Sequence, residues 1–170
     1  MPRVAAKILV KELAKQGMTV AAAESCTAGL ATDFIAGIPG ASLVFWGSFV
    51  AYTPEAKIKM LGVNRELLRN HGAVSRSVAL AMAEGALKKS GASLAFSITG
   101  LAGPGGDGSN IPVGTVWIGL AGWDKNRKNT LWSKAKMVFL KGSRNELRKA
   151  AASAALNELL EELSKDIGDS

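Results

Sequence analysis

Two segments of this chain carry apolar side chains on both faces of a strand, and they constrain the fold more than any other feature. They are SLVFWGSFVAY, residues 42–52, and SLAFSITG, residues 93–100. Strands without polar alternation are typical of a sheet that is covered on both faces, as in α/β proteins. We therefore expect both segments to be buried central strands with helices packed above and below them.

Helix signals lie before, between and after these strands. Thr53-Pro54-Glu55 combines a threonine N-cap with a proline at the first helical position and an acid in the first turn. Ser143 and Glu146 form a capping box ahead of an Ala- and Leu-rich segment that reaches about residue 165. The expected helices cover residues 5–16, 27–37, 54–61, 64–71, 75–89 and 144–165.

Three further strands are expected. MTVAAA, residues 18–23, is short and apolar, whereas TVWIGLAG, residues 115–122, and TLWSKAKMVFL, residues 130–140, form an antiparallel pair across residues 123–129. The alternation of Lys134 and Lys136 with apolar neighbours predicts that the last strand is an exposed edge protected by lysines. The sequence thus predicts one domain, residues 1–170, with an α/β fold: a three-layer α/β/α sandwich around a mostly parallel sheet with one antiparallel strand pair.

The composition excludes several classes of protein. A single Cys26 rules out an internal disulfide, and with His71 as the only histidine it argues against a zinc site. No apolar run reaches the about 20 residues that span a bilayer, and no signal-peptide segment is present. We expect a cytoplasmic protein without metal, cofactor or membrane partner. The net charge of +7 favours either phosphate binding or a solvated lysine-rich face.

A glycine-rich loop, TGLAGPGGDGSN at residues 99–110, follows the second buried strand. It matches G-x-G-x-x-G literally, but a strand and not a helix is expected after it, so it is not a dinucleotide fingerprint. Open α/β sheets bind ligands beyond the carboxyl ends of their strands, and glycines let amide groups approach a phosphate or an oxyanion. The alternative is a long connection that needs glycine only for turning. The candidate substrate contacts in this loop are Gly100, Gly103, Gly105 and Gly106.

Ser25 is the candidate nucleophile. It lies in AAAESCTAGLAT, residues 21–32, where a strand is expected to pass into a helix, so that a helix N-terminus and nearby amides would favour an oxyanion. The alternative is an ordinary N-cap. Cys26 and Thr27, which follow it, are candidate substrate contacts.

A serine that does not use histidine needs another base, and lysine is the usual substitute. Lys57 lies in the first turns of the helix that begins at Pro54, where the helix dipole and burial would lower the pKa of its ammonium. The alternative is a solvated surface lysine. Tyr52 ends the preceding strand and would relay protons or simply pack, and the Thr99 hydroxyl ends another strand and would reach the same crevice.

Long segments of the chain resemble one family, the C-terminal domain of the CinA competence/damage-inducible proteins. The resemblance is carried by AAESCTAGL, FWGSFVAYTPEAKIKMLGV, SITGLAGPGG, PVGTVWIGLA and FLKGSRNELRKAAASAAL, in this order. Three departures are Ala28, where the family often has glycine, Arg76, where an acid is common, and the form of the loop 103–114. Because the chain starts at this domain, we expect the standalone type.

The resemblance implies an anticodon-binding-domain-like fold, usually as a homodimer. It also implies a nicotinamide-nucleotide amidohydrolase, which converts nicotinamide mononucleotide to nicotinate mononucleotide and ammonia in pyridine nucleotide salvage. The family's serine nucleophile falls on Ser25, and its Tyr, Lys and Thr partners fall on Tyr52, Lys57 and Thr99. Arg144, in the family's Gly-x-Arg segment, would hold the substrate phosphate or only pack at a helix start.

Two other functions remain open at this point. The same pocket would serve a nucleotide sensor that binds without turnover. The basic segment 125–149 would serve nucleic-acid binding, although no recognition motif or aromatic stacking surface accompanies it.

Overall fold

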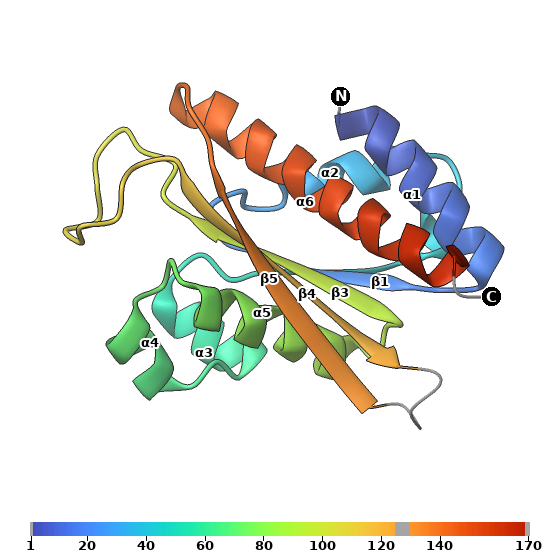
Figure 1. Cartoon of the computed structure of the whole chain (residues 1–170), viewed down its shortest axis with the longest axis horizontal. Helices are drawn as coiled ribbons and strands as arrows, with labels where there is room; N and C mark the ends of the chain where they lie inside the picture. The colour runs from blue at the N-terminus through green and yellow to red at the C-terminus, as the bar shows by residue number, and fades with distance from the viewer. Residues whose placement is uncertain (1, 125–129, 169–170) are drawn as a thin grey trace.

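The computed structural model of the chain describes residues 2–124 and 130–168 and has three layers, with a five-stranded sheet between two layers of helices (Figure 1). The strand order is β2-β1-β3-β4-β5. β1 pairs in parallel with β2 and β3, whereas β3–β4 and β4–β5 pair antiparallel. The predicted three-layer sandwich is confirmed, and antiparallel pairing extends to β3–β4 beyond the one predicted pair. The strands are β1 Val20–Glu24, β2 Phe45–Val50, β3 Leu94–Gly100, β4 Thr115–Asp124 and β5 Thr130–Phe139.

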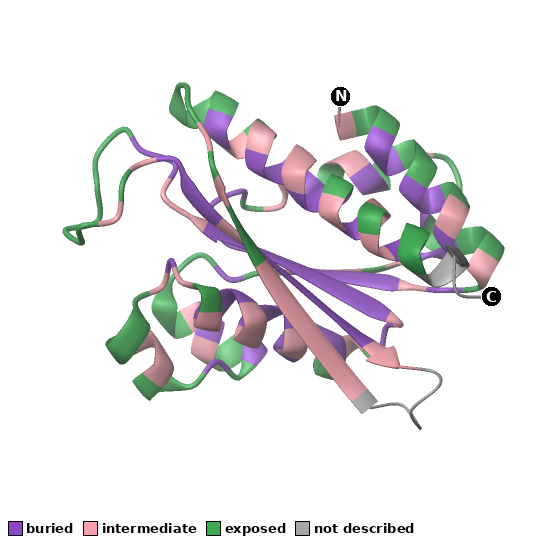
Figure 2. Ribbon diagram, viewed as in Figure 1, coloured by how far each residue is buried: buried purple, intermediate pink, exposed green. Residues whose placement is uncertain are grey.

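The helices divide between the two faces of the sheet. One layer holds α1, α2 and α6, and the other holds α3, α4 and α5 (Figure 1). Figure 2 shows the buried residues along the sheet and on the helix faces that are turned toward it. The helices are α1 Pro2–Gln16, α2 Leu30–Ala36, α3 Pro54–Leu61, α4 Arg65–His71, α5 Arg76–Ser90 and α6 Arg144–Gly168, with a short 3₁₀ turn at Ala41–Leu43.

Most of the predicted helix ends are confirmed. They were predictable because the capping residues lie next to the helix ends in the sequence. Thr53, Asn64 and Ser75 accept hydrogen bonds from the first turns of α3, α4 and α5. Gly62 and Gly91 end α3 and α5 in the left-handed conformation. At the start of α6 the Glu146 carboxylate accepts from the Ser143 amide at 2.8 Å, as a capping box requires.

Two predictions about the sheet need correction or refinement. The segment 42–52 is not central: β2 is an edge strand, and it leaves Trp46 and Val50 exposed. An apolar pattern cannot distinguish a strand paired on both sides from an edge strand whose outward side chains pack on each other, as Trp46 stacks on Phe49 with ring centroids 5.7 Å apart. β5 is the opposite edge, as predicted, but its two lysines pair with α6: Lys134 with Glu162 and Lys136 with Glu158. Of the connection expected at residues 123–129, Trp123 and Asp124 belong to β4, and residues 125–129 lie outside the described part of the chain.

The helix expected over residues 27–37 begins only at Leu30. Ala28 and Gly29 have φ angles of 49° and 93°, and this left-handed backbone prevents the helix from extending back to Ser25. Ser25 is therefore not an N-cap, and the residue that caps α2 in its place is described below. Within the described part of the chain, no helix has the length and apolar character needed to cross a membrane.

Candidate active site

The site lies where the parallel strands β1, β2 and β3 end at the same edge of the sheet. Ser25 directly follows β1, and its amide donates to Ile98 O of β3 at 2.9 Å. Tyr52 lies two residues after β2, and Thr99 is the penultimate residue of β3. The register of the parallel strands therefore brings together three side chains that are far apart in the sequence, as open α/β sheets do at their ligand sites.

Lys57 completes the centre from the α3 layer. Its side chain is buried, and its Nζ lies 2.7 Å from Ser25 Oγ and 3.1 Å from Ala51 O. The Thr53 cap fixes the start of α3, and Gly85 of α5 lets the Leu61 backbone pack closely, since a Cβ there would lie 2.1 Å from Leu61 O. The structure thus places the predicted base in direct contact with the predicted nucleophile.

Burial lowers the pKa of the Lys57 amine from 10.5 to about 8, because an ammonium loses hydration energy inside the protein. At neutral pH a useful fraction of this amine is therefore uncharged, and an uncharged amine accepts a proton from a hydroxyl 2.7 Å away. This pair has the geometry of a serine activated by a lysine base.

In the structure, the Tyr52 side chain contacts Arg144 at the rim of the site. Its side chain is half exposed, its backbone O lies 3.5 Å from Ser25 Oγ, and its hydroxyl accepts from Arg144 Nη2 at 2.8 Å. Because Lys57 contacts Ser25 directly, a proton does not need the phenol to pass between them. Tyr52 instead joins Arg144 at the rim.

Thr99 lies in the wall of the site, with its hydroxyl already committed. Its side chain is buried and Oγ1 donates to Ala73 O at 2.8 Å. This bond ties β3 to the segment that leads into α5. The hydroxyl proton is therefore engaged by Ala73 O in this structure.

A cavity of about 280 Å³ opens beside the Ser25–Lys57 pair. Its volume is near the lower end of the range of about 300–1,000 Å³ for small-molecule sites. All four catalytic candidates line it, and so do Cys26, Arg144 and the four glycines predicted in the loop. Thr27 does not line the cavity: it is fully buried, and its Oγ1 has no hydrogen-bond partner within the described part of the chain.

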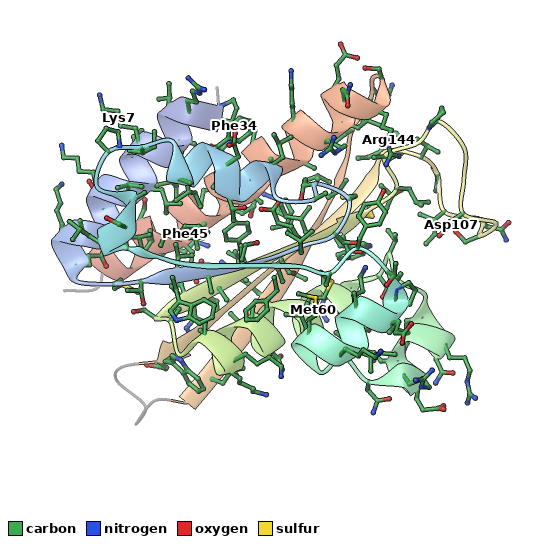
Figure 3. The ribbon with its side chains drawn as sticks, turned by 180° about the vertical axis from the view of Figure 1, so that it is seen from behind. Lys7, Phe34, Phe45, Met60, Asp107 and Arg144 are labelled. Atoms are coloured by element: carbon green, nitrogen blue, oxygen red, sulfur yellow. The ribbon has the colours of Figure 1, made fainter. Side chains whose placement is uncertain are left out.

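Arg144, at the start of α6, bridges the rim of this cavity. Nη1 donates to Gly103 O at 2.6 Å while Nη2 reaches the Tyr52 hydroxyl. Figure 3 shows Arg144 at the base of the loop that carries Asp107, a further lining residue that the sequence did not single out. Among the described residues, no group of three or more His, Cys, Asp and Glu side chains is arranged to hold a metal ion.

Two residues beside the nucleophile were missed by the sequence analysis. Glu24 is fully buried and accepts from the amides that open α2, so the helix N-terminus faces this carboxylate and not Ser25. Arg148 of α6 donates to Cys26 O and Thr27 O. The available signals were an acid at the end of an otherwise apolar strand and an arginine one helical turn after Arg144.

Comparison with known proteins identifies the family. The CinA C-terminal domain family matches residues 3–163. A competence-damage inducible protein of Symbiobacterium thermophilum is 48% identical over 148 residues, which cover 85% of this chain and 34% of the relative. A CinA-like protein of Akkermansia muciniphila is 42% identical over 160 residues, 94% of this chain and 37% of the relative. The chain thus spans about a third of the length of these curated relatives.

Solved structures match over nearly the whole chain. The competence/damage inducible protein CihA of Agrobacterium tumefaciens superposes with a TM-score of 0.85 at 39% identity, covering 96% of this chain and 95% of that one. A CinA superfamily protein of Klebsiella pneumoniae gives a TM-score of 0.89 at 26% identity, covering 97% and 99%. On sequence and fold together, the chain belongs to the CinA C-terminal domain family.

Proposed function

We propose that this chain hydrolyses the carboxamide of nicotinamide mononucleotide to nicotinate mononucleotide and ammonia. The observation that carries the proposal is the 2.7 Å contact between Lys57 Nζ and Ser25 Oγ beside a cavity. A serine paired with a buried lysine suits acyl transfer, and the resemblance to the CinA family supplies the substrate.

The reaction proceeds through an acyl-enzyme. Neutral Lys57 takes the Ser25 proton as Oγ attacks the carboxamide carbon, and the Lys57 ammonium then returns a proton to the leaving nitrogen, which departs as ammonia. Lys57 next takes a proton from water, whose oxygen attacks the ester carbon. Nicotinate mononucleotide leaves, and the proton returns to Ser25.

In this mechanism, backbone amides other than that of Ser25 donate hydrogen bonds to the oxyanion. The Ser25 and Leu101 amides already donate to Ile98 O at 2.9 Å and Thr115 O at 3.0 Å. We assign the oxyanion to the amide of Cys26 and to amides of the loop residues Ala102, Gly103, Gly105 and Gly106, because these residues line the cavity next to Ser25.

The test is ammonia release from nicotinamide mononucleotide by the purified, chelator-treated chain. We expect ammonia and nicotinate mononucleotide in equal amounts. Saturable binding of the nucleotide without product would replace the proposal with a nucleotide sensor, and neither binding nor product would remove nicotinamide mononucleotide as the ligand.

The rate should rise with pH below about 8. Lys57 acts as a base only when uncharged, and burial lowers its pKa to about 8. We therefore expect kcat/KM to increase about tenfold per pH unit below that value and to level off above it. A profile from initial rates between pH 5.5 and 9.5 checks this. A flat profile across pH 6–8 would argue against Lys57 as the base.

Replacing Arg144 separates phosphate binding from packing. If Arg144 holds the phosphate, Arg144→Met should raise KM for nicotinamide mononucleotide about tenfold or more, since charged hydrogen bonds contribute about 1.5–3 kcal/mol. Nicotinamide riboside, which lacks the phosphate, should show little change. Equal effects on both substrates would mean that Arg144 only anchors Gly103 and Tyr52.

A further inference from the structure

The turn that carries Ser25 is held on one side by a buried carboxylate. Glu24 Oε2 accepts from the amides of Gly29 at 3.0 Å and Ala31 at 3.1 Å. Glu24 Oε1 accepts from both the amide and the hydroxyl of Thr32 at 2.9 Å. All four partners are donors, so each oxygen of the carboxylate faces two of them.

Glu24 and Ser25 face opposite layers of the molecule. Glu24 bonds to the start of α2 on one face of the sheet, whereas Ser25 bonds to Lys57 of α3 on the other. Successive residues at a strand end point to opposite faces, so fixing one side chain fixes the direction of the next. Any rotation of the Glu24 backbone therefore moves Ser25 relative to Lys57.

An arginine holds the same turn from a third element. Arg148 Nε donates to Cys26 O at 3.2 Å and its Nη2 to Thr27 O at 2.9 Å. The next residue, Ala28, has a φ of 49°, a conformation that alanine adopts only when its surroundings impose it. The Glu24 carboxylate thus accepts from the amides that follow the turn, and the Arg148 guanidinium donates to the carbonyls within it.

We propose that Glu24 and Arg148 are a pair of positioning residues that hold the 25–29 turn so that Ser25 Oγ stays in reach of Lys57. This inference rests on the proposed amidase function for its kinetic consequence. The pinning of the turn itself does not depend on that function, and it has its own measurement.

Glu24→Gln gives the kinetic test, because glutamine keeps the shape but replaces one acceptor oxygen with an amide NH₂ that faces at least one backbone N–H donor at the start of α2. A misplacement of about 1 Å can lower a rate about 10²-fold, so we expect kcat to fall by about that factor. KM should stay within about threefold, since the cavity wall is intact, and the pH midpoint should be unchanged. Arg148→Met should behave similarly, with partial recovery in Arg148→Lys. Leu163→Ala is the control for lost stability, because it removes buried side-chain volume near the C-terminal end of α6, away from the turn. This variant should keep the kcat of the unmodified protein.

Cys26 offers a readout that needs no enzymatic activity, because it is the only cysteine of the chain and lies buried within this turn. We expect a disulfide reagent to label its thiol at least about tenfold faster in Glu24→Gln and in Arg148→Met than in the unmodified protein, because local opening controls such access. Leu163→Ala should label at nearly the original rate.

Electrostatics distinguish opening of the turn from a change in thiol ionisation. The pKa of the Cys26 thiol is raised to about 11, chiefly by burial; the charge of Glu24 contributes to this rise and the charge of Arg148 opposes it. If only the ionisation of the thiol changed, Arg148→Met would raise its pKa and slow the labelling of Cys26. Under the same condition Glu24→Gln would lower the pKa and speed the labelling.

Faster labelling in both variants, with reduced kcat, supports the inference. Slower labelling in Arg148→Met, unchanged labelling in both, or equal acceleration in Leu163→Ala overturns it. An unmodified chain without amidase activity would end the proposed function and leave the labelling test of the turn standing. Normal amidase activity with unchanged kcat in Glu24→Gln would end this inference alone.

Discussion

Ser25→Ala is expected to lower amide hydrolysis of nicotinamide mononucleotide by at least about 10³-fold. Losing a single oxyanion donor already costs about 10²–10³-fold, and losing the nucleophile removes the covalent route entirely. The hydroxyl lies 2.7 Å from Lys57 Nζ in the wall of the cavity. Initial rates of ammonia release from the variant and the unmodified chain measure the effect.

Ser164→Ala is the matched control. Ser164 is an exposed serine on α6 whose hydroxyl donates to Leu160 O, and alanine suits a helix at least as well. It should keep full activity. Because Ser25→Ala leaves the cavity walls in place, it should still bind the nucleotide with similar affinity. Full hydrolysis by Ser25→Ala would exclude Ser25 as the nucleophile.

Lys57→Met is expected to remove activity to a similar degree while making the protein more stable. Methionine fills most of the buried volume, so the loss of rate would report the missing amine rather than a cavity. Lys57 and Ser25 act as a unit, so the double variant should be scarcely slower than either single one. Lys59→Met, two residues along the same helix, is the control, because Lys59 is exposed and pairs with Glu55 at the surface.

The gain in stability follows from the lowered pKa. Keeping a lysine with a pKa of about 8 instead of 10.5 costs about 3 kcal/mol of unfolding free energy at neutral pH, at about 1.4 kcal/mol per pKa unit. Lost hydrogen bonds to Ser25 and Ala51 O offset about 1–2 kcal/mol of this cost. We expect Lys57→Met to be more stable at pH 7 by on the order of 1–2 kcal/mol.

The pH dependence of this gain has a definite sign. Between about pH 8 and 10.5 the unfolded chain holds a proton on Lys57 that the folded chain has released. The stability of the unmodified protein therefore gains from Lys57 as pH rises through that window. The advantage of Lys57→Met should shrink over the same window, as urea unfolding at pH 7 and pH 10 would show. An advantage that is equal at both pH values would contradict a lowered Lys57 pKa.

The helix starts and ends could be predicted from the sequence, because short-range interactions determine them. The Thr53 cap and the Gly62 and Gly91 helix ends depend on neighbours within a few residues, and the structure contains each of them. The meeting of Ser25 and Lys57 was also predictable, because the carboxyl ends of parallel strands share an edge and α3 starts there. Their roles in catalysis stay predictions.

Features that depend on tertiary context were not predictable in the same way. The strand at residues 42–52 has the composition of a central strand but lies at an edge. Ser25 resembles a helix cap, yet Glu24 caps α2 because Ala28 and Gly29 delay the helix. Arg148 contacts a turn more than 120 residues earlier in the chain, and no spacing in the sequence indicates that contact.

A direct titration of the Lys57 amine tests the central claim. In protein labelled with ¹⁵N at lysine, with Lys57→Met to assign the signal, the Lys57 resonance should titrate near pH 8, apart from the exposed lysines. A midpoint at or above about 10, the ordinary value for lysine, would mean that the amine next to Ser25 is charged at neutral pH and is not the base of this site.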